Sequence, residues 1–248
     1  MIEVTHINKS FLEKHILSDV SFSFEKGKAN LIIGASGTGK TVLLKVIVGL
    51  IRADSGLVLF DGRDFTNGDS DMKTDIRREM GMLFQNSALF DSKNVEENVI
   101  FPLDMLTHQS KEEKLERVNF CLQRVGLENV NKKMPSELSG GMKKRVGIAR
   151  AIVLNPKYLF CDEPNSGLDP QTSIKIDDLI YELTHEFNTT TVVVTHDMNS
   201  VMDIGDKILF MYKGKKLWEG TNDEIMETDV KELQDFIFAN HLLKSYRK

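Results

Sequence analysis

The stretch GASGTGKT, residues 34–41, lies between an apolar segment over 28–33 and a largely apolar run over 42–51. A strand, a glycine-rich loop and a helix in this order are typical of a phosphate-binding loop, so we expect a strand over 28–33 and a helix over 40–50. Glycines let main-chain amides face the phosphates, and the helix start adds a positive dipole end. A flexible surface loop is the alternative, and the apolar segments on both sides argue against it. The loop is expected to bind phosphate through Gly34, Ala35, Ser36, Gly37, Thr38, Gly39, Lys40 and Thr41.

Two side chains of this loop have separate expected roles. Lys40 is expected to bridge the outer phosphates of a nucleotide. Thr41 is expected to offer its hydroxyl to Mg²⁺, a hard cation that prefers oxygen ligands and keeps several waters. The loop therefore predicts a magnesium-dependent nucleoside triphosphatase, with ATP and Mg²⁺ as its cofactors.

Two adjacent acids follow the apolar segment over 158–161, namely Asp162 and Glu163. Neighbouring side chains on a strand point in opposite directions. We therefore expect Asp162 to face the magnesium ion, and Glu163 to polarise a water in line with the terminal phosphate. Acids at a strand end are common, so the motif gains its weight from the phosphate loop.

His196 follows the apolar segment over 191–195, at the carboxyl end of a strand, where open parallel sheets place their ligands. An isolated histidine at such a position is more often structural. Beside the two motifs above, a contact with the terminal phosphate is favoured, and His196 joins Glu163 as an expected catalytic residue.

The composition is that of an ordinary globular protein with a slight acidic excess. The 248 residues are 41% hydrophobic and 28% charged, with a net charge of −5. This length suits one domain with an inserted subdomain, and the net charge argues against nucleic acid as a partner. The basic run over 142–145 is an exception, for which a solvated helix face is the favoured interpretation.

The cysteines argue against a zinc or redox site, and the apolar runs argue against a membrane-spanning segment. Cys121 and Cys161 lack the paired spacing of a zinc or redox site, so both side chains are expected to be buried in the protein core. Unpaired cysteines also fit a protein of a reducing compartment. The run over 42–51 is interrupted by Lys45, whereas a bilayer span needs about 20 apolar residues. The chain also opens without a basic leader and apolar core, so a membrane role is expected to require a partner.

Periodicity divides the chain into three parts. In the first part, strands are expected over 3–7, 20–24, 28–33 and 57–60. In the second part, from about 85 to 155, helical periodicity dominates. In the third part, strands over 158–161, 191–195 and 207–211 alternate with helices over 171–186 and 197–203. Alternation of this kind predicts an α/β fold with a parallel sheet. We expect one domain over 1–248, with a nucleotide-binding core from 1–85 and 156–221, a helical subdomain over 86–155 and a helical tail over 222–248.

The tail carries four candidate buried side chains, Leu233, Phe236, Ile237 and Phe238. A packing helix is favoured, and an element that docks a partner stays open.

The sequence LSGGM, residues 138–142, precedes a predicted helix that ends near residue 154. Amides and the helix dipole at such a start attract anions. The order of phosphate loop, LSGGM and acidic pair resembles the ATP-binding cassette (ABC) family, in which this element is the signature motif. The resemblance covers nearly the whole chain and implies a P-loop NTPase (RecA-like) core sheet, N-terminal antiparallel strands and an inserted α-helical subdomain.

The resemblance also implies roles for single residues. Phe11 would stack on adenine, and Gln85 would bind the magnesium ion and link it to the helical subdomain. Two copies of the chain would pack head to tail around two nucleotides. The loop over 166–169, which ends at Asp169, would meet the second copy, and that copy's ATP would be contacted by Ser139, Gly140 and Gly141.

Three positions depart from the common family pattern. Phe11 replaces a tyrosine and preserves stacking. Val42, which the resemblance places among the ATP-binding residues, stands where many members have a second hydroxyl for the α-phosphate. Met142 replaces the glutamine after the signature motif.

Met142, together with MPSELSGGMKKR (134–145) and LFQNSALFDSKNVEENVIFPL (83–103), resembles a narrower group, the ATPases of Mla-type lipid transporters. Such systems move phospholipid between inner and outer membrane. The implied partners are an integral membrane permease (MlaE-like), an MCE-domain lipid-binding protein and a small STAS-type regulatory subunit. The implied location is the cytoplasmic side of the inner (plasma) membrane, reached through the permease, whose coupling helix would dock on the segment after Gln85.

Two other functions stay open. A cassette ATPase for another cargo, such as amino acids, metals or a drug, has the same nucleotide chemistry. A cassette ATPase of DNA repair or chromosome organisation is disfavoured, because the segment between phosphate loop and signature motif, residues 42–137, lacks sustained heptads.

Overall fold

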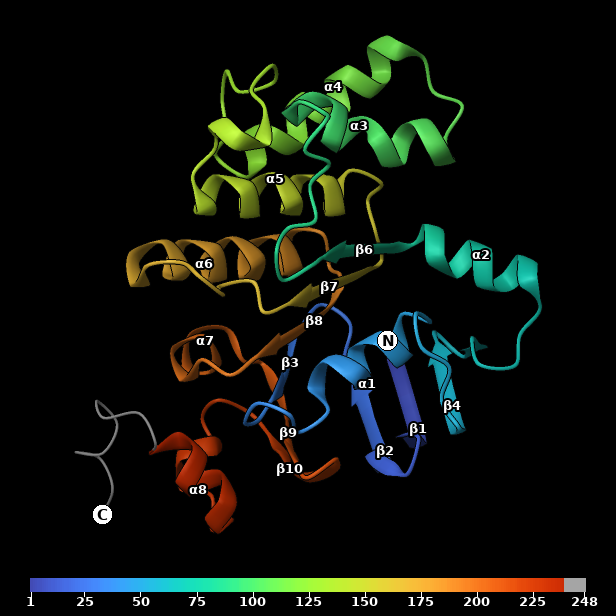
Figure 1. Cartoon of the computed structure of the whole chain (residues 1–248), viewed down its shortest axis with the longest axis vertical. Helices are drawn as coiled ribbons and strands as arrows, with labels where there is room; N and C mark the ends of the chain where they lie inside the picture. Colours follow the sequence, from blue (N-terminus) through green and yellow to red (C-terminus); the bar gives the residue numbers. More distant parts are fainter. Residues whose placement is uncertain (239–248) are drawn as a thin grey trace.

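The computed structural model describes residues 1–238 and contains two sheets that face each other across helix α1 (Lys40–Ile47) (Figure 1). The four-stranded sheet has the order β2-β1-β4-β5 and is antiparallel; its strands are β1 (Ile2–Phe11), β2 (Lys14–Phe24), β4 (Ser55–Phe60) and β5 (Arg63–Asp64). The predicted N-terminal antiparallel strands are thereby confirmed.

The six-stranded sheet has the order β10-β9-β3-β8-β7-β6. All neighbouring pairs are parallel except β9 with β10. Its strands are β3 (Ala29–Ile33), β6 (Met80–Leu83), β7 (Tyr158–Asp162), β8 (Thr190–Thr195), β9 (Lys207–Tyr212) and β10 (Lys215–Gly220). Because β3, β7 and β8 are parallel neighbours, the loops that follow them lie at one edge of the sheet.

The six-stranded sheet buries both of its faces, which explains why its central strands are mostly apolar. Along β3, Leu31 belongs to the core beneath the helical layer, whereas Ile32 belongs to the core shared with α1 and the antiparallel sheet. The same alternation places Phe160 of β7 on the α1 side. Two residues further along β7, Asp162 is therefore directed toward the start of α1.

The helical layer covers the first of these cores. It includes α3 (Val95–Leu106), α4 (Lys111–Arg124), the 3₁₀ turn η1 (Pro135–Glu137) and α5 (Gly140–Ile152), with α6 (Pro170–Glu186) and α7 (Met198–Ile204) closer to the sheet (Figure 1). Asn94 and Ser110 begin α3 and α4 with capping boxes, which satisfy the first free amides of each helix. None of the helices within 1–238 is long and apolar enough to cross a membrane.

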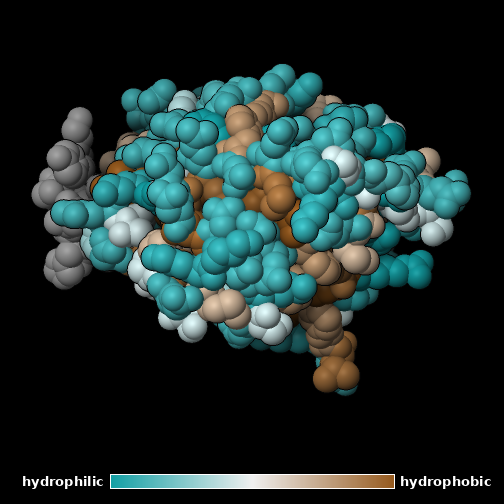
Figure 2. All heavy atoms as spheres, turned by 90° about the horizontal axis from the view of Figure 1, so that it is seen from above, coloured by the Kyte–Doolittle hydropathy of each residue, from teal (hydrophilic) through white to brown (hydrophobic). Residues whose placement is uncertain are grey.

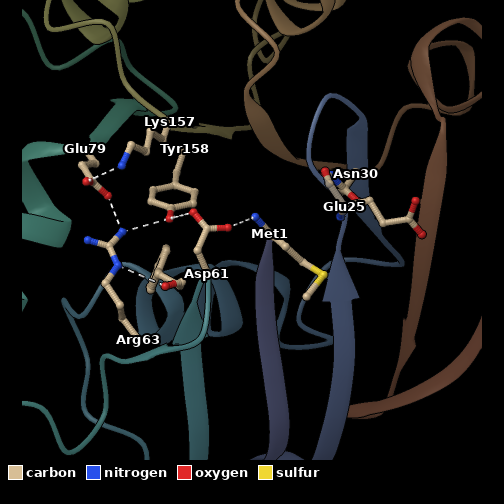
Figure 3. Close-up of polar contacts among 9 residues, drawn as sticks. Met1, Glu25, Asn30, Asp61, Arg63, Glu79, Lys157 and Tyr158 are labelled. Atoms are coloured by element: carbon tan, nitrogen blue, oxygen red, sulfur yellow. Dashed lines mark hydrogen bonds and ion pairs between the residues drawn. The ribbon is translucent and has the colours of Figure 1, made fainter.

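A polar cluster ties the antiparallel sheet to the parallel one (Figure 3). The hydroxyl of Tyr158, in β7, donates to Asp61 at 2.5 Å and accepts from the Arg63 guanidinium at 3.1 Å. Arg63 also pairs with Glu79, just before β6. Burial raises the pKa of Tyr158, with the Asp61 hydrogen bond adding to it, so the phenol keeps its proton. The cluster fixes the two sheets relative to each other.

Several elements differ from their predicted bounds. The helix after the phosphate loop ends at Ile47, not at 50, because Gly49 adopts a φ of +75° and the amides of Leu50 and Ile51 turn back to the Lys45 carbonyl. Helix α2 (Ser70–Arg78) and strands β5, β6 and β10 were not predicted.

The end of the described chain packs as the tail pattern suggests. After η2 (Ile225–Glu227), helix α8 (Lys231–Ile237) buries Leu233 and Ile237. Phe238 is also buried, and Phe236 packs against the same core from a partly buried position. The remainder of the predicted tail, 239–248, lies outside the described residues.

Candidate functional site

The phosphate loop lies at the carboxyl end of β3 and has a backbone that requires glycine. Gly34, Gly37 and Gly39 have φ values of +144°, +79° and +100°. A Cβ on Gly39 would lie 2.9 Å from the main-chain oxygen of Ile16 in β2, so the antiparallel sheet packs against the loop and leaves no room for a side chain there. Around Gly37 no atom would lie within 4 Å of a Cβ, and the loop is open on that side. The start of α1 adds amides that have no intrahelical acceptor.

Lys40 is buried inside this loop, with an exposed fraction of 5%. Its Nζ atom donates to the carbonyl oxygens of Gly34 at 2.8 Å and Ala35 at 3.0 Å. Burial lowers the pKa of Lys40, and the nearby carboxylates of Glu163 and Asp162 oppose that shift. The loop therefore holds a desolvated cation at the end of β3.

Thr41 and Asp162 come together as the sequence predicts. The Thr41 hydroxyl donates to Oδ1 of Asp162 at 3.3 Å. Burial raises the pKa of Asp162, while the Thr41 hydrogen bond lowers it. Within residues 1–238 there is no cluster of three histidine, cysteine or acidic side chains that could hold a metal. One hydroxyl and one carboxylate fit Mg²⁺ with the remaining ligands from phosphate and water, which is how this ion commonly binds beside nucleotides.

Glu163 adopts a backbone conformation that is rare for a residue with a side chain, with a φ of +47°. Its amide donates to the Val194 carbonyl at 2.9 Å, which turns the chain after β7. Its carboxylate accepts from Nε2 of Gln85 at 3.0 Å and lies 3.3 Å from Nδ1 of His196. Strained backbone of this kind clusters at functional sites.

Gln85 and His196 thus both contact Glu163. Both side chains are exposed, on the loop after β6 and the loop after β8. The Gln85 amide contacts Glu163 and, at 3.5 Å, the Ser166 hydroxyl, rather than Thr41 or Asp162. Its predicted role as a metal ligand stays a prediction, and its observed contact is with the acid.

Lys144 is a buried residue whose surroundings the sequence analysis missed. It lies in α5 with an exposed fraction of 4% and donates to the main-chain oxygens of Gln85 and Glu163. Burial lowers its pKa, and Cys161, Glu163 and Asp162 oppose that shift. The interpretation of the basic run over 142–145 as a solvated face is wrong for Lys144. Helical spacing was the available signal, because Ile148 lies four residues further along the same face and is buried.

The signature segment lies against the loop that precedes α6. Ser139 begins α5 and accepts from the Met142 amide at 3.3 Å. A Cβ on Gly140 would meet Leu168 at 3.4 Å, and one on Gly141 would meet the Thr172 side chain at 2.6 Å. Asp169 begins α6 by accepting from the amide of the same Thr172 at 3.0 Å. The structure therefore brings the predicted signature residues and the predicted dimer loop together.

Phe11 ends β1 on an exposed hairpin, with 45% of its surface accessible. It pairs with Lys14, two residues before the Ile16 that touches the phosphate loop. The aromatic ring is exposed on this hairpin, and its contact with a base stays a prediction. Val42 is partly buried and packs into the core around α1, so its side chain serves packing.

The chain is similar to known proteins over most of its length. A family model described as "ABC transporter" matches residues 17–166. The chain is 37% identical to the probable ribonucleotide transport ATP-binding protein mkl of Mycobacterium leprae, over 95% of this chain and 68% of that protein. It is 41% identical to the methionine import ATP-binding protein MetN 1 of Staphylococcus aureus, over 91% of this chain and 67% of that protein. The chain thus spans about two thirds of these curated relatives.

Solved structures share the fold across almost the entire chain. The dimeric ATP-binding cassette MJ0796, in a post-hydrolysis state with ADP and phosphate, is 33% identical with a TM-score of 0.81, over 90% of this chain and 99% of that one. The protein cbiO1 from Clostridium perfringens, part of the ABC transporter complex cbiONQ, is 29% identical with a TM-score of 0.84, over 98% of both chains.

Proposed function

We propose that this chain, which belongs to the ABC transporter family as an ATP-binding and ATP-hydrolysing subunit, powers phospholipid transport between inner and outer membrane. The nucleotide chemistry follows from one observation in particular. The Glu163 carboxylate accepts from Gln85 and lies beside His196, at the sheet edge that carries the phosphate loop. An acid held in this way is suited to polarise water beside a terminal phosphate.

The remaining roles follow from the contacts of each residue. The amides over 34–41 would bind the triphosphate, and Lys40 would exchange its two carbonyl partners for phosphate oxygens. His196 would donate to the terminal phosphate and orient Glu163. Thr41 and Asp162 would hold Mg²⁺, whose positive charge would neutralise phosphate charge during transfer.

A second copy of the chain completes the site in this proposal. At the start of α5, Gly140 lies beside Leu168 of the loop that ends at Asp169, Gly141 lies beside Thr172 of α6, and Ser139 caps the helix. Helix-start amides suit anions, so this surface would contact ATP bound by the other copy. The dimeric state of the solved cassette MJ0796 supports the same arrangement.

A groove beside the edge strand β6 would receive the coupling helix of a permease. It has a volume of about 380 Å³ and is lined mainly by apolar side chains, among them Met80, Met82, Phe84, Phe90, Phe101 and Pro102. Arg150 fixes one wall by donating to the carbonyl oxygens of Ser87 and Ala88. Hydrophobic surface is also exposed among hydrophilic residues on the helical end seen in Figure 2. Exposed apolar grooves of this kind are typical of partner sites.

The cargo proposal is supported by the two segments that resemble Mla-type ATPases, 83–103 and 134–145. The first of them forms part of the groove. In this proposal the chain is peripheral on the cytoplasmic side of the inner membrane, with an MlaE-like permease, an MCE-domain protein and a STAS-type subunit as partners. The names of the relatives, a ribonucleotide transporter and a methionine importer, favour a different cargo as the second candidate.

Purification of the tagged chain from membranes, followed by protein and lipid identification, tests the proposal. We expect a permease, an MCE-domain protein and bound phospholipid to copurify. Phe90→Asp should release the permease, whereas Phe120→Asp, at an equally exposed phenylalanine of α4 outside the groove, should not. A permease without lipid and without an MCE partner would contradict the phospholipid assignment and favour another cargo.

A further inference from the structure

A buried carboxylate outside the nucleotide site joins the two segments that carry Glu163 and His196. Asp177 lies in α6 with an exposed fraction of 2%. Its Oδ2 atom accepts from Nδ2 of Asn165 at 2.6 Å and from Oγ of Ser200 at 2.8 Å. Asn165 also donates to the Ser200 hydroxyl at 3.0 Å, so the three side chains form a closed triangle.

Each corner of this triangle has a defined relation to the site. Asn165 follows Glu163 by two residues, in the loop that leads to Asp169. Ser200 follows His196 by four residues, in the first turn of α7. Two hydrogen bonds hold this loop to α6: Asp169 accepts from a main-chain amide in the first turn, and Asn165 donates to Asp177 in the third turn. Displacement of either segment would therefore break a bond to Asp177.

The buried carboxylate of Asp177 does not stabilise the fold. Its Oδ1 atom is buried and has no hydrogen-bond partner among the described residues. Burial raises its pKa to about 6, and Asp197 and Asp203 add repulsion. The adjoining cavity of about 340 Å³ has no cationic side chain in its lining. A buried charge with these neighbours costs stability and points to another role.

We propose that Asp177 is a positioning residue which, through Asn165 and Ser200, keeps Glu163 and His196 at hydrogen-bond distance during ATP hydrolysis. The inference rests on the proposed roles of Glu163 and His196. It assigns no substrate contact to Asp177, because within residues 1–238 its carboxylate bonds only to Asn165 and Ser200. Misplacement of a reacting group by about 1 Å can lower turnover roughly 100-fold.

Steady-state ATP hydrolysis by the whole 248-residue chain tests this. Asp177→Ala should lower kcat roughly 10- to 100-fold and leave the KM for ATP within about threefold, since the phosphate loop is untouched. Asp177→Asn keeps an acceptor oxygen and should recover most of kcat. Asp178→Ala, at the exposed neighbour, should behave as the wild type. A kcat for Asp177→Ala within about twofold of the wild type, or a change confined to KM, overturns the proposal.

A double-mutant cycle keeps the test valid if Asp177→Ala does not fold. Asn165→Ala and Ser200→Ala act on opposite segments, so additive losses in kcat would show that the triangle around Asp177 does not couple them. We expect the double variant to lose less than the sum of the single losses. The Glu163→Gln variant distinguishes a failure of the proposed base from a failure of the positioning role of Asp177. If it keeps normal turnover, the proposed base and this inference both fall; if it loses turnover and Asp177→Ala does not, only the positioning role falls.

Discussion

The Nζ atom of Lys144 donates to the main-chain oxygen of Glu163 at 3.2 Å. The same ammonium group donates to the main-chain oxygen of Gln85, so one buried cation of α5 joins the loop after β6 to the loop after β7. The Gln85 and Glu163 side chains also contact each other. The helix that begins at the signature segment is therefore bonded to the backbone of the proposed base.

Replacement of Lys144 tests this link. Lys144→Met keeps most of the apolar stem but removes hydrogen bonds from a charged donor, which are each worth about 1.5–3 kcal/mol. Two such bonds are lost, so if half of their contribution acts at the transition state, kcat falls at least about tenfold. ATP hydrolysis assays should show this loss, whereas Lys111→Met, at an exposed lysine of α4, should show none. An unchanged kcat would mean that the link does not contribute to turnover.

Glu163→Gln should bind ATP normally but lose most turnover. General bases contribute about 10²- to 10⁴-fold, and glutamine cannot accept the proton of the attacking water. With ATP bound and not cleaved, the variant should persist as a dimer, which size-exclusion chromatography with light scattering detects. Glu182→Gln, on the exposed face of α6, serves as the matched control. Near-normal hydrolysis by the Glu163 variant would refute its role as the base.

Lys40→Ala should lose nucleotide binding before any effect on chemistry can be measured. The variant removes the buried cation of the phosphate loop and leaves the carbonyl oxygens of Gly34 and Ala35 without their donor. Isothermal titration with Mg-ATP should show at least about a tenfold weaker affinity, as expected for one lost charge-assisted contact. Lys175→Ala, at an exposed lysine of α6, should bind as the wild type does. Equal affinities would place the nucleotide elsewhere.

Asp177 gives the protein a specific dependence of stability on pH. Its pKa is raised from 3.8 to about 6 by burial, so the folded state binds the proton more tightly than the unfolded state. The sign follows directly: stability falls as the pH rises from about 4 to about 6, by at most about 3 kcal/mol, and then levels off. Urea unfolding should show Asp177→Asn gaining stability relative to the wild type over that range. A difference independent of pH would contradict the shift.

Much of the fold could be predicted because local patterns determine it. Strands β3, β7 and β8 are buried along their whole length and are mostly apolar, as is typical of strands buried on both faces. The missed elements carry little such signal: α2 buries only Ile76, and β10 is an edge strand with charged residues and no fully buried position. Their place is decided by tertiary contacts, which local periodicity does not report.

In the site, too, the features that depend on local sequence could be predicted, and those that depend on tertiary contacts could not. Thr41 and Asp162 were predicted to meet because each motif fixes its own position at a strand end. Lys144 and Asp177 were not identified, because their partners lie far away in sequence or in another element, and a charged residue is usually exposed. Gln85 was assigned to the metal from the resemblance, whereas its observed partner is Glu163.

A crystal structure with Mg²⁺ and a non-hydrolysable ATP analogue tests the central claim most directly. The account predicts a triphosphate lying along the amides of residues 34–41, with Nζ of Lys40 moved from the Gly34 and Ala35 carbonyls to phosphate oxygens. Asp162 should lie beside the Mg²⁺ ion, and Glu163 should lie beside the terminal phosphate. A nucleotide bound elsewhere, or a Lys40 still bonded to both carbonyls beside it, would contradict the account.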